Sequence, residues 1–267
     1  MLNELADESN KKRDIPEILL TETDTNRLEL AESDLTDLEA AQRYMGRMKE
    51  HMTSFVVVRM FPQMMSKYTC LNPICGYITR KVDRQPDLSL SITKDTPEQI
   101  TLDYLIGHDY GQSNQQTLSK ARCNECQRKG LPLEGKRQER WLCYLPEYLQ
   151  ITLQRYDTYS NKLHNHVTIP ERGVDLSKYF IDPNAAAGSE VIGHRPNPIY
   201  DCYAIISHSG SSIQFGHWFT YARSLDKGSK DGRGGRWHLF NDKLVKPVSY
   251  SEIDPRQATV IFLKRRV

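Results

Sequence analysis

Apolar and polar positions alternate along most of the chain in the way that short β-strands require. The segments with this pattern are rich in β-branched and aromatic residues, and loops rich in Gly, Pro and Asn separate them. The predicted strands cover residues 55–61, 77–82, 88–92, 148–156, 166–169, 200–207, 218–224, 237–241 and 258–265. We therefore expect the C-terminal half to be mostly antiparallel sheet.

A helical pattern precedes these strands. Residues 33–37 have the polar side chains of a helix start, and apolar residues then recur at helical spacing to about residue 51. The apolar stripe consists of Leu38, Ala41, Tyr44, Met45 and Met48. We predict a helix over residues 36–52 whose stripe packs in the core, and before it a polar, flexible lead-in over residues 1–35.

Composition and charge bear on the kind of partner and on the cellular compartment. The net charge of +2 and the isoelectric point near 8.1 favour neither a nucleic-acid partner nor a membrane partner. The N-terminal residues hold no apolar secretory segment, and the chain has no Asn-x-Ser/Thr glycosylation site. We expect an intracellular protein, cytoplasmic or nuclear, that is monomeric. In a reducing compartment its six cysteines are expected to bind metal or to react, rather than to form disulfides.

Four of the cysteines form two close pairs. Four residues separate Cys70 from Cys75, and two residues separate Cys123 from Cys126. Tight turns within each pair would bring four thiolates onto one ion, which matches a closed tetrahedral zinc site. The strand-like spacer between the pairs implies a zinc ribbon at the tip of a β extension. The alternative is four unligated thiols.

Cys70 has a second interpretation, because the segment 68–72 resembles a protease nucleophile box. His217 follows at a papain-like distance of roughly 130–150 residues. A nucleophilic cysteine, however, usually needs a helix N-terminus to lower its pKa, and strand-like segments follow Cys70. This interpretation is therefore the weaker one.

A nucleic-acid module built on the cysteine ribbon is a further alternative. The basic residues that favour it are Lys120, Arg122, Arg128, Lys129, Lys136 and Arg137. The region lacks the interleaved aromatic residues that stack on bases, so a solvated basic face is the better interpretation.

His217 and the pair Asn241-Asp242 are the candidate catalytic residues. They lie near the start and at the end of two successive predicted strands, which the loop 226–236 joins into a hairpin. In a cysteine protease a histidine takes the thiol proton, and an Asn or Asp side chain holds its ring in the required tautomer. Gly216 lets the backbone pass close to a substrate at that point. A packed or surface histidine is the alternative.

Several motifs occur in a recognisable order. After the two cysteine pairs come LPEYLQITLQRYD at 145–157, YDCYAIISHSG at 200–210, GHWFTYAR at 216–223 and WHLFND at 237–242. This succession resembles the catalytic domain of the ubiquitin-specific proteases over residues 53–267. The resemblance implies an α+β, papain-like cysteine-protease fold, present in part, with an antiparallel palm and zinc-bearing β fingers that grip ubiquitin.

The resemblance also assigns roles by position. His217 matches the general base, Asn241 the residue that orients it, and Asp242 the acidic residue that follows and can share that role. The four paired cysteines match the zinc ligands, although the first pair has four intervening residues where the family usually has two. The loop 207–216 matches a loop beside the channel for ubiquitin's C-terminal tail.

The domain boundaries follow from the same match. Residues 36–52 would be the last helix of the thumb, residues 53–138 the fingers and residues 139–267 the palm. The remaining cysteines, Cys143 and Cys202, lie in alternating strands and are expected to be core thiols.

The family's Gly-x-x-Cys box has no match upstream of Cys70 in the printed sequence. We therefore expect the fingers and palm of a deubiquitinase that acts on ubiquitin and ubiquitinated proteins, without the nucleophile segment and inactive as a hydrolase by itself. The alternative is a non-catalytic ubiquitin-binding scaffold.

Overall fold

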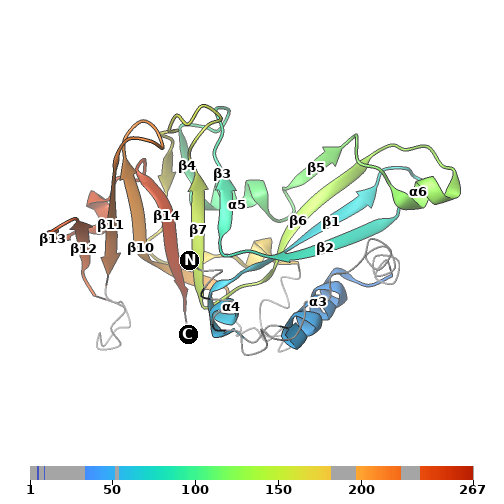
Figure 1. Ribbon diagram of the computed structural model, residues 1–267, viewed down its shortest axis with the longest axis horizontal. Helices are drawn as coiled ribbons and strands as arrows, with labels where there is room; N and C mark the ends of the chain where they lie inside the picture. Colours follow the sequence, from blue (N-terminus) through green and yellow to red (C-terminus); the bar gives the residue numbers. More distant parts are fainter. Residues whose placement is uncertain are drawn as a thin grey trace. The chain divides into compact units, whose positions relative to one another are not determined.

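The computed structural model describes most of the chain from residue 34 onward (Figure 1). The described residues are Leu5, Ser9, 34–51, 54–181, 197–223 and 235–266, without the side chains of Met45 and of residues 47–51. The predicted lead-in over residues 1–35 and the loop 226–236 lie almost entirely outside this set. The described chain divides into two compact units, and each unit combines segments that are distant in sequence.

The first unit comprises residues 1–86, 107–146 and 177–196. Its sheet is antiparallel, with the strand order β2-β1-β6-β5. The strands are β1 (Gln63–Cys70), β2 (Ile78–Arg84), β5 (Gln115–Leu118) and β6 (Lys136–Tyr144). Besides the helices α3 and α4 described below, the unit contains the short helix α6 (Asn124–Lys129) and the 3-10 turn η1 (Ser177–Tyr179).

Helix α3 (Asp37–His51) confirms the predicted helix and packs on this sheet. Its residues Ala40 and Ala41 are buried in one apolar cluster with Met65 of β1 and Cys143 of β6. Small alanine side chains allow the helix to approach the strands closely. Cys143 is 1% exposed, which confirms the prediction that it is a core thiol.

An ion pair also ties α3 to the sheet. The carboxylate of Asp37 accepts a hydrogen bond of 2.9 Å from Lys67 Nζ and one of 2.6 Å from Arg80 Nε. Burial alone would raise the pKa of Asp37, but the hydrogen bonds and positive charges of Lys67 and Arg80 outweigh burial and lower it.

We expect Asp37→Asn to lower the free energy of unfolding by about 1 kcal/mol at pH 7. Because the folded-state pKa of Asp37 lies below its unfolded value, its contribution is complete above the unfolded pKa and disappears as pH falls through the folded pKa. Urea unfolding of both proteins at several pH values measures this, and the gap between them should close in acid. A gap of constant size would contradict an ionic contribution.

Helix α4 (Phe55–Met60) corrects one prediction, because a strand was expected over residues 55–61. The side chain of Ser54 caps the helix by accepting a hydrogen bond from the backbone N–H of Val57. Val57 and Phe61 are buried together in one cluster. The cap and this burial outweigh the preference of β-branched residues for strands.

The second unit comprises residues 87–106, 147–176 and 197–267 and contains the larger sheet. Its strand order is β13-β12-β11-β10-β14-β7-β3, with β9 also paired to β10. The strands are β3 (Leu88–Ser91), β7 (Tyr148–Gln154), β9 (Val174–Asp175), β10 (Ile199–Ser209), β11 (His217–Arg223), β12 (Trp237–Asn241), β13 (Leu244–Val248) and β14 (Ala258–Arg265). All neighbouring pairs are antiparallel except β3 with β7.

Three smaller regular elements and one helix lie around these strands in the sequence. They are the parallel pair β4 (Gln99–Thr101) and β8 (His166–Thr168), the 3-10 turn η3 (Tyr250–Glu252) and the helix α5 (Leu102–Asp109). The fold is therefore mixed α+β with mostly antiparallel sheet, as expected. None of the helices in the described ranges is long and apolar enough to cross a membrane.

Alternating burial fixes the register at the centre of the larger sheet. In β7, Leu149 and Ile151 are buried and lie opposite Leu263 and Ile261 of β14. A register slip of one residue would turn these side chains to the other face of the sheet. Cys202 of β10 is opposite Leu263 and fully buried, which confirms it as a core thiol, and burial raises its pKa to about 12.

Candidate active site and metal centre

Strands β11 and β12 bring His217 and Asn241 together. His217 is the first residue of β11 and Asn241 the last residue of β12, and the two strands are antiparallel neighbours. Nε2 of His217 lies 2.6 Å from Oδ1 of Asn241. Because a carbonyl oxygen only accepts hydrogen bonds, this contact places the proton on Nε2. Nδ1 is then the nitrogen that can accept a proton from a thiol.

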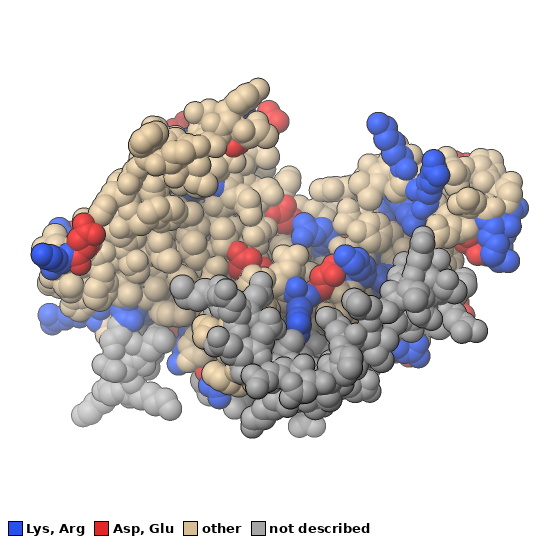
Figure 2. Space-filling view, viewed as in Figure 1, with Lys and Arg blue, Asp and Glu red and all other residues tan. Residues whose placement is uncertain are grey.

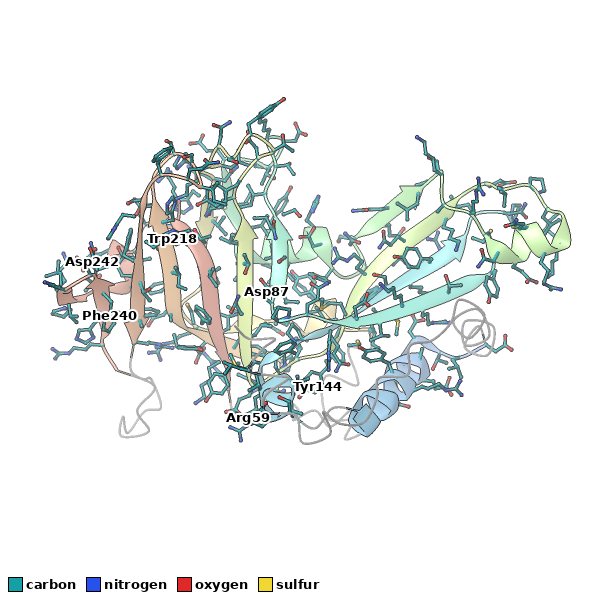
Figure 3. All side chains as sticks on the ribbon, in the orientation of Figure 1. Arg59, Asp87, Tyr144, Trp218, Phe240 and Asp242 are labelled. Carbon is teal, nitrogen blue, oxygen red and sulfur yellow. The ribbon has the colours of Figure 1, made fainter. Side chains whose placement is uncertain are left out.

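Asp242 lies farther from the imidazole. Its Oδ2 is 3.6 Å from Nε2 of His217, and its side chain is 78% exposed. Its φ of 51° places the backbone in the left-handed region, where the chain turns from β12 towards β13. Figure 3 shows Asp242 and Phe240 at this end of the hairpin. The structure thus brings all three predicted residues together, with Asn241 as the direct hydrogen-bond partner of His217.

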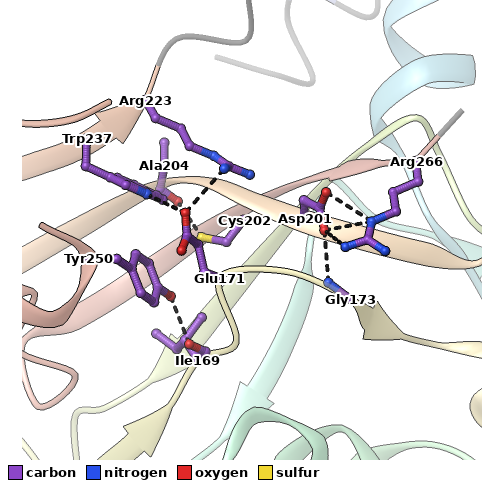
Figure 4. A network of polar contacts seen from close by, with 10 residues as sticks. All are labelled: Ile169, Glu171, Gly173, Asp201, Cys202, Ala204, Arg223, Trp237, Tyr250 and Arg266. Atoms are coloured by element: carbon purple, nitrogen blue, oxygen red, sulfur yellow. Dashed lines mark hydrogen bonds and ion pairs between the residues drawn. The ribbon is translucent and has the colours of Figure 1, made fainter. Parts of the chain in front are cut away.

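A polar network fixes the other end of the same hairpin (Figure 4). Arg223 ends β11 and lies opposite Trp237, which begins β12. Oε1 of Glu171 accepts hydrogen bonds from Trp237 Nε1 at 3.0 Å and from Arg223 Nη1 at 3.3 Å. One carboxylate therefore holds both strands. Sequence reasoning missed Glu171 because 66 positions separate it from Trp237.

The four paired cysteines form a compact cluster in the first unit. Their sulfur atoms all lie within 4.8 Å of one another. The distance is 3.5 Å from Cys70 Sγ to Cys126 Sγ and 3.8 Å from Cys75 Sγ to Cys123 Sγ. Sulfurs at about 2.3 Å from a tetrahedral zinc would be separated by about 3.8 Å. The cluster therefore has the dimensions of a metal site.

Two different backbone devices build this cluster. Cys70 ends β1, and the turn that follows it is closed by Asn72, whose carbonyl oxygen accepts hydrogen bonds from the N–H groups of Cys75 and Gly76. This turn accommodates the four residues between the first pair. The second pair lies at the start of α6, with Cys123 at the N-cap position. Helix α6 is not among the elements predicted from the sequence.

The pKa values of the thiols are those of a crowded cluster. Burial and the three neighbouring thiols raise the pKa of Cys126, and burial also raises that of Cys70. Burial by itself would raise the pKa of Cys123 too, but hydrogen bonds from the backbone of Cys126 and from the thiols of Cys70 and Cys75 lower it. Four adjacent thiolates are stable only with a cation, because like charges otherwise repel. A nucleophilic Cys70 would need the opposite shift.

Several Lys and Arg side chains project from the surface of this region (Figure 2). Of the basic residues named in the sequence analysis, Lys136 is half-buried and the other five are exposed. Arg128 and Lys129 both contact the carboxylate of Glu125, and their hydrogen bonds, together with their charges, lower its pKa to about 2. Part of the basic charge is thus neutralised within α6.

Comparison with known proteins identifies the family. Residues 111–263 match the family model described as ubiquitin carboxyl-terminal hydrolase. Ubiquitin carboxyl-terminal hydrolase 2 of Bos taurus is 29% identical over 213 residues, which are 75% of this chain and 29% of that protein. Ubiquitin carboxyl-terminal hydrolase 3 of Mus musculus is 26% identical over 218 residues, or 75% of this chain and 37% of that protein. The chain thus spans about a third of the length of these relatives.

Solved structures share the fold. A yeast SAGA deubiquitinating module superposes with a TM-score of 0.61 at 21% identity, covering 84% of this chain and 45% of that chain. The SAGA Ubp8/Sgf11/Sus1/Sgf73 module bound to ubiquitin aldehyde also gives 0.61 at 21% identity, covering 86% of this chain and 49% of that chain. The family model alone matches more than half of the chain. The chain therefore belongs to the ubiquitin carboxyl-terminal hydrolase family and, within it, to the ubiquitin-specific protease group.

Proposed function

We propose that this chain supplies the base and the ubiquitin-binding surface of a cysteine deubiquitinase that hydrolyses the bond after ubiquitin's C-terminal glycine. The observation that carries this proposal is the 2.6 Å contact between His217 Nε2 and Asn241 Oδ1 in a chain of this family. The contact leaves Nδ1 of His217 as the proton acceptor, and the His217 side chain is 45% exposed, so a substrate can reach it.

The reaction follows from these groups. Nδ1 of His217 takes the proton of a thiol, and the thiolate attacks the carbonyl carbon of the terminal glycine. The protonated imidazole then gives its proton to the leaving lysine amine as the C–N bond breaks. Water hydrolyses the thioester, with His217 again acting as base, which restores the thiol and releases the ubiquitin carboxylate. The side-chain carbonyl oxygen of Asn241 accepts the hydrogen bond from Nε2 throughout, and it stabilises the imidazolium whenever that forms.

The thiol itself is proposed to come from a segment outside the printed residues. Cys202 is the one cysteine in the sequence ranges of the second unit. It lies seven positions along β10 from Ser209, the residue opposite His217, which is roughly 23 Å at strand spacing. It is also fully buried, with a raised pKa. We therefore propose that the printed chain alone has no thiol-dependent turnover.

We further propose that Cys70, Cys75, Cys123 and Cys126 bind one structural zinc ion. The four sulfur atoms have the spacing of a closed tetrahedral site, which leaves no position for a substrate. The ion would neutralise the thiolates and hold the end of β1 to the start of α6. Its role is to stabilise the fold, and no chemical step of the hydrolysis needs it.

Two measurements on the printed chain test the proposal. We expect the zinc-loaded chain to shift amide signals of ¹⁵N-labelled ubiquitin, and to release no fluorophore from ubiquitin with a fluorogenic C-terminal amide. Absence of any ubiquitin shift would contradict the proposal. Turnover that Cys70→Ala abolishes would assign the nucleophile to Cys70 instead.

The second candidate function is a non-catalytic ubiquitin-binding scaffold. Activity measurements on the natural protein that carries these residues distinguish it from a deubiquitinase. For a deubiquitinase, His217→Ala should lower its kcat/KM by at least about 10³-fold, because the members of a catalytic set act together. His238→Ala, in the neighbouring strand β12, is the matched control and should leave turnover unchanged. Ubiquitin binding without turnover in the natural protein would favour the scaffold.

A further inference from the structure

A second histidine, His208, contacts both residues that flank His217 in the sequence. In the β10–β11 pair, His208 lies opposite Trp218, and their ring centroids are 4.5 Å apart. On the other side of His217, the backbone of Gly216 runs against the imidazole of His208. Both sequence neighbours of the candidate base therefore contact the same ring.

The contact with Gly216 leaves no room for a side chain. Gly216 has a φ of 152°, and a Cβ at this position would overlap Nε2 of His208 and the carbonyl oxygen of Ser209. A Cβ at Gly210, across the same turn, would lie 3.1 Å from Cε1 of His208. Nε2 and Cε1 of the His208 ring thus pack against the glycine backbone of this turn, just before His217.

His208 is itself held in place from several directions. It is 1% exposed, and its Nδ1 lies 3.0 Å from the hydroxyl of Tyr156. Its backbone N–H donates to the carbonyl oxygen of Gln257 at 2.9 Å, and Lys162 Nζ donates to its backbone carbonyl oxygen. Burial, together with the nearby charges of Lys162 and His217, lowers its pKa and keeps the ring neutral. The contact between Nδ1 and the Tyr156 hydroxyl fixes the orientation of the ring, whichever of the two groups donates.

We propose that His208 is a positioning residue for His217: its fixed ring supports Gly216 and Trp218 and so aims the His217 imidazole at Asn241. The catalytic meaning of this inference rests on the proposed function, because it matters for turnover only if His217 is the base. The placement of His217 is a property of the fold and can be measured separately.

A purely structural role would predict a different result. If His208 only filled the core, its replacement would lower stability and leave the hydrogen bond between His217 and Asn241 intact in the protein that still folds. A positioning role predicts a changed His217 tautomer in folded protein. Without the support of His208, the His217 imidazole would no longer be held against Asn241.

Long-range ¹H–¹⁵N spectra of the histidine side chains in the zinc-loaded chain provide the measurement, because they report which ring nitrogen carries the proton. In the unmodified chain we expect His217 in the Nε2–H form. His208→Asn keeps a polar group that can hydrogen-bond Tyr156 but removes the outer ring atoms, so His217 should become a mixture of tautomers. The matched control His238→Asn, on the adjacent strand, should leave the His217 signals unchanged.

Tyr156→Phe serves as the second variant if His208→Asn fails to fold, because it removes one oxygen atom and leaves the packing intact. It should give an intermediate change at His217. Unchanged His217 signals in folded His208→Asn, or in Tyr156→Phe where the former does not fold, would overturn the proposal. In the natural protein we expect His208→Asn to lower kcat by roughly 10- to 100-fold with little change in KM.

The ubiquitin titration described above keeps the two proposals apart. A His217 tautomer that responds to His208→Asn in a chain that binds no ubiquitin would support the positioning role and contradict the proposed function. Ubiquitin binding together with a His217 tautomer that His208→Asn does not change would support the proposed function and contradict the positioning role.

Discussion

Replacing Cys126 by serine should abolish stoichiometric zinc binding and unfold the end of the first unit. Cys126 is fully buried in α6, and its sulfur lies 3.5 Å from that of Cys70. A serine hydroxyl is a poor substitute for a thiolate ligand, and it would leave three thiols crowded around an incomplete site. Structural zinc sites contribute about 10–16 kcal/mol of apparent binding free energy, so the loss of one ligand removes a large part of what orders this region.

The measurement is zinc content per chain together with thermal unfolding. We expect about one zinc per unmodified chain, near zero in Cys126→Ser, and a lower unfolding temperature for the variant. Cys143→Ala is the matched control, because Cys143 is equally buried but lies in a different cluster, with Ala40, Ala41 and Met65. It should retain full zinc. Full zinc content in Cys126→Ser, or none in the unmodified chain, would contradict the zinc proposal.

The sequence predicted which residues of each candidate site lie together, because each grouping depends on short spacings. Two close cysteine pairs predicted a shared cluster, which the structure forms. The strands that carry His217 and Asn241 are neighbours in the chain, so pairing between them followed from the hairpin pattern alone. The order of motifs along the chain identified the family, which the family model confirms.

What the sequence did not predict depends on contacts between distant segments. The run 55–61 has the composition of a strand, and only the cap at Ser54 and the burial of its apolar side chains make it a helix. Glu171 reaches Arg223 and Trp237 across 52 and 66 positions. His208 was part of a recognised motif, but its contact with Gly216 is visible only once β10 and β11 are paired.

Arg155 shows the same limit most clearly, because its position in a strand-like segment gave no sign of complete burial. Its side chain is fully buried, and its guanidinium donates to four backbone carbonyl oxygens. Nε donates to Ala258 at 2.5 Å, Nη2 to Pro255 at 2.7 Å, and Nη1 to Leu163 at 3.1 Å and to Asn165 at 2.8 Å. One side chain therefore joins β14, the turn before it and the segment that leads to β8.

Burial lowers the pKa of Arg155 to about 10, while the charge of Asp254 acts in the opposite direction. The guanidinium therefore remains protonated at neutral pH, and its hydrogen bonds are charge-assisted. Arg155→Met keeps most of the apolar volume but leaves four carbonyl oxygens without their donor. We expect a loss of about 3–5 kcal/mol in the free energy of unfolding, since unmet hydrogen bonds at buried groups are costly.

Urea unfolding of the zinc-loaded chain measures this loss, and Arg137→Met is the matched control. Arg137 is exposed on β6, so its replacement should change the free energy of unfolding by no more than about 0.5 kcal/mol. A change of similar size in both variants would contradict the role assigned to Arg155. Arg155→Lys should fall between them, because one ammonium group cannot reach carbonyl oxygens on every side.

The effect of Arg155→Met should extend to the candidate base. Arg155 holds the carbonyl oxygens of Pro255 and Ala258, and Gln257 between them accepts the backbone hydrogen bond of His208. Loosening that segment removes one of the contacts that fix His208, and through it the support of Gly216. If His208 positions His217, folded Arg155→Met should show the same mixture of His217 tautomers as His208→Asn. A destabilised variant with a fixed His217 tautomer would separate the stability of the sheet from the placement of its histidine.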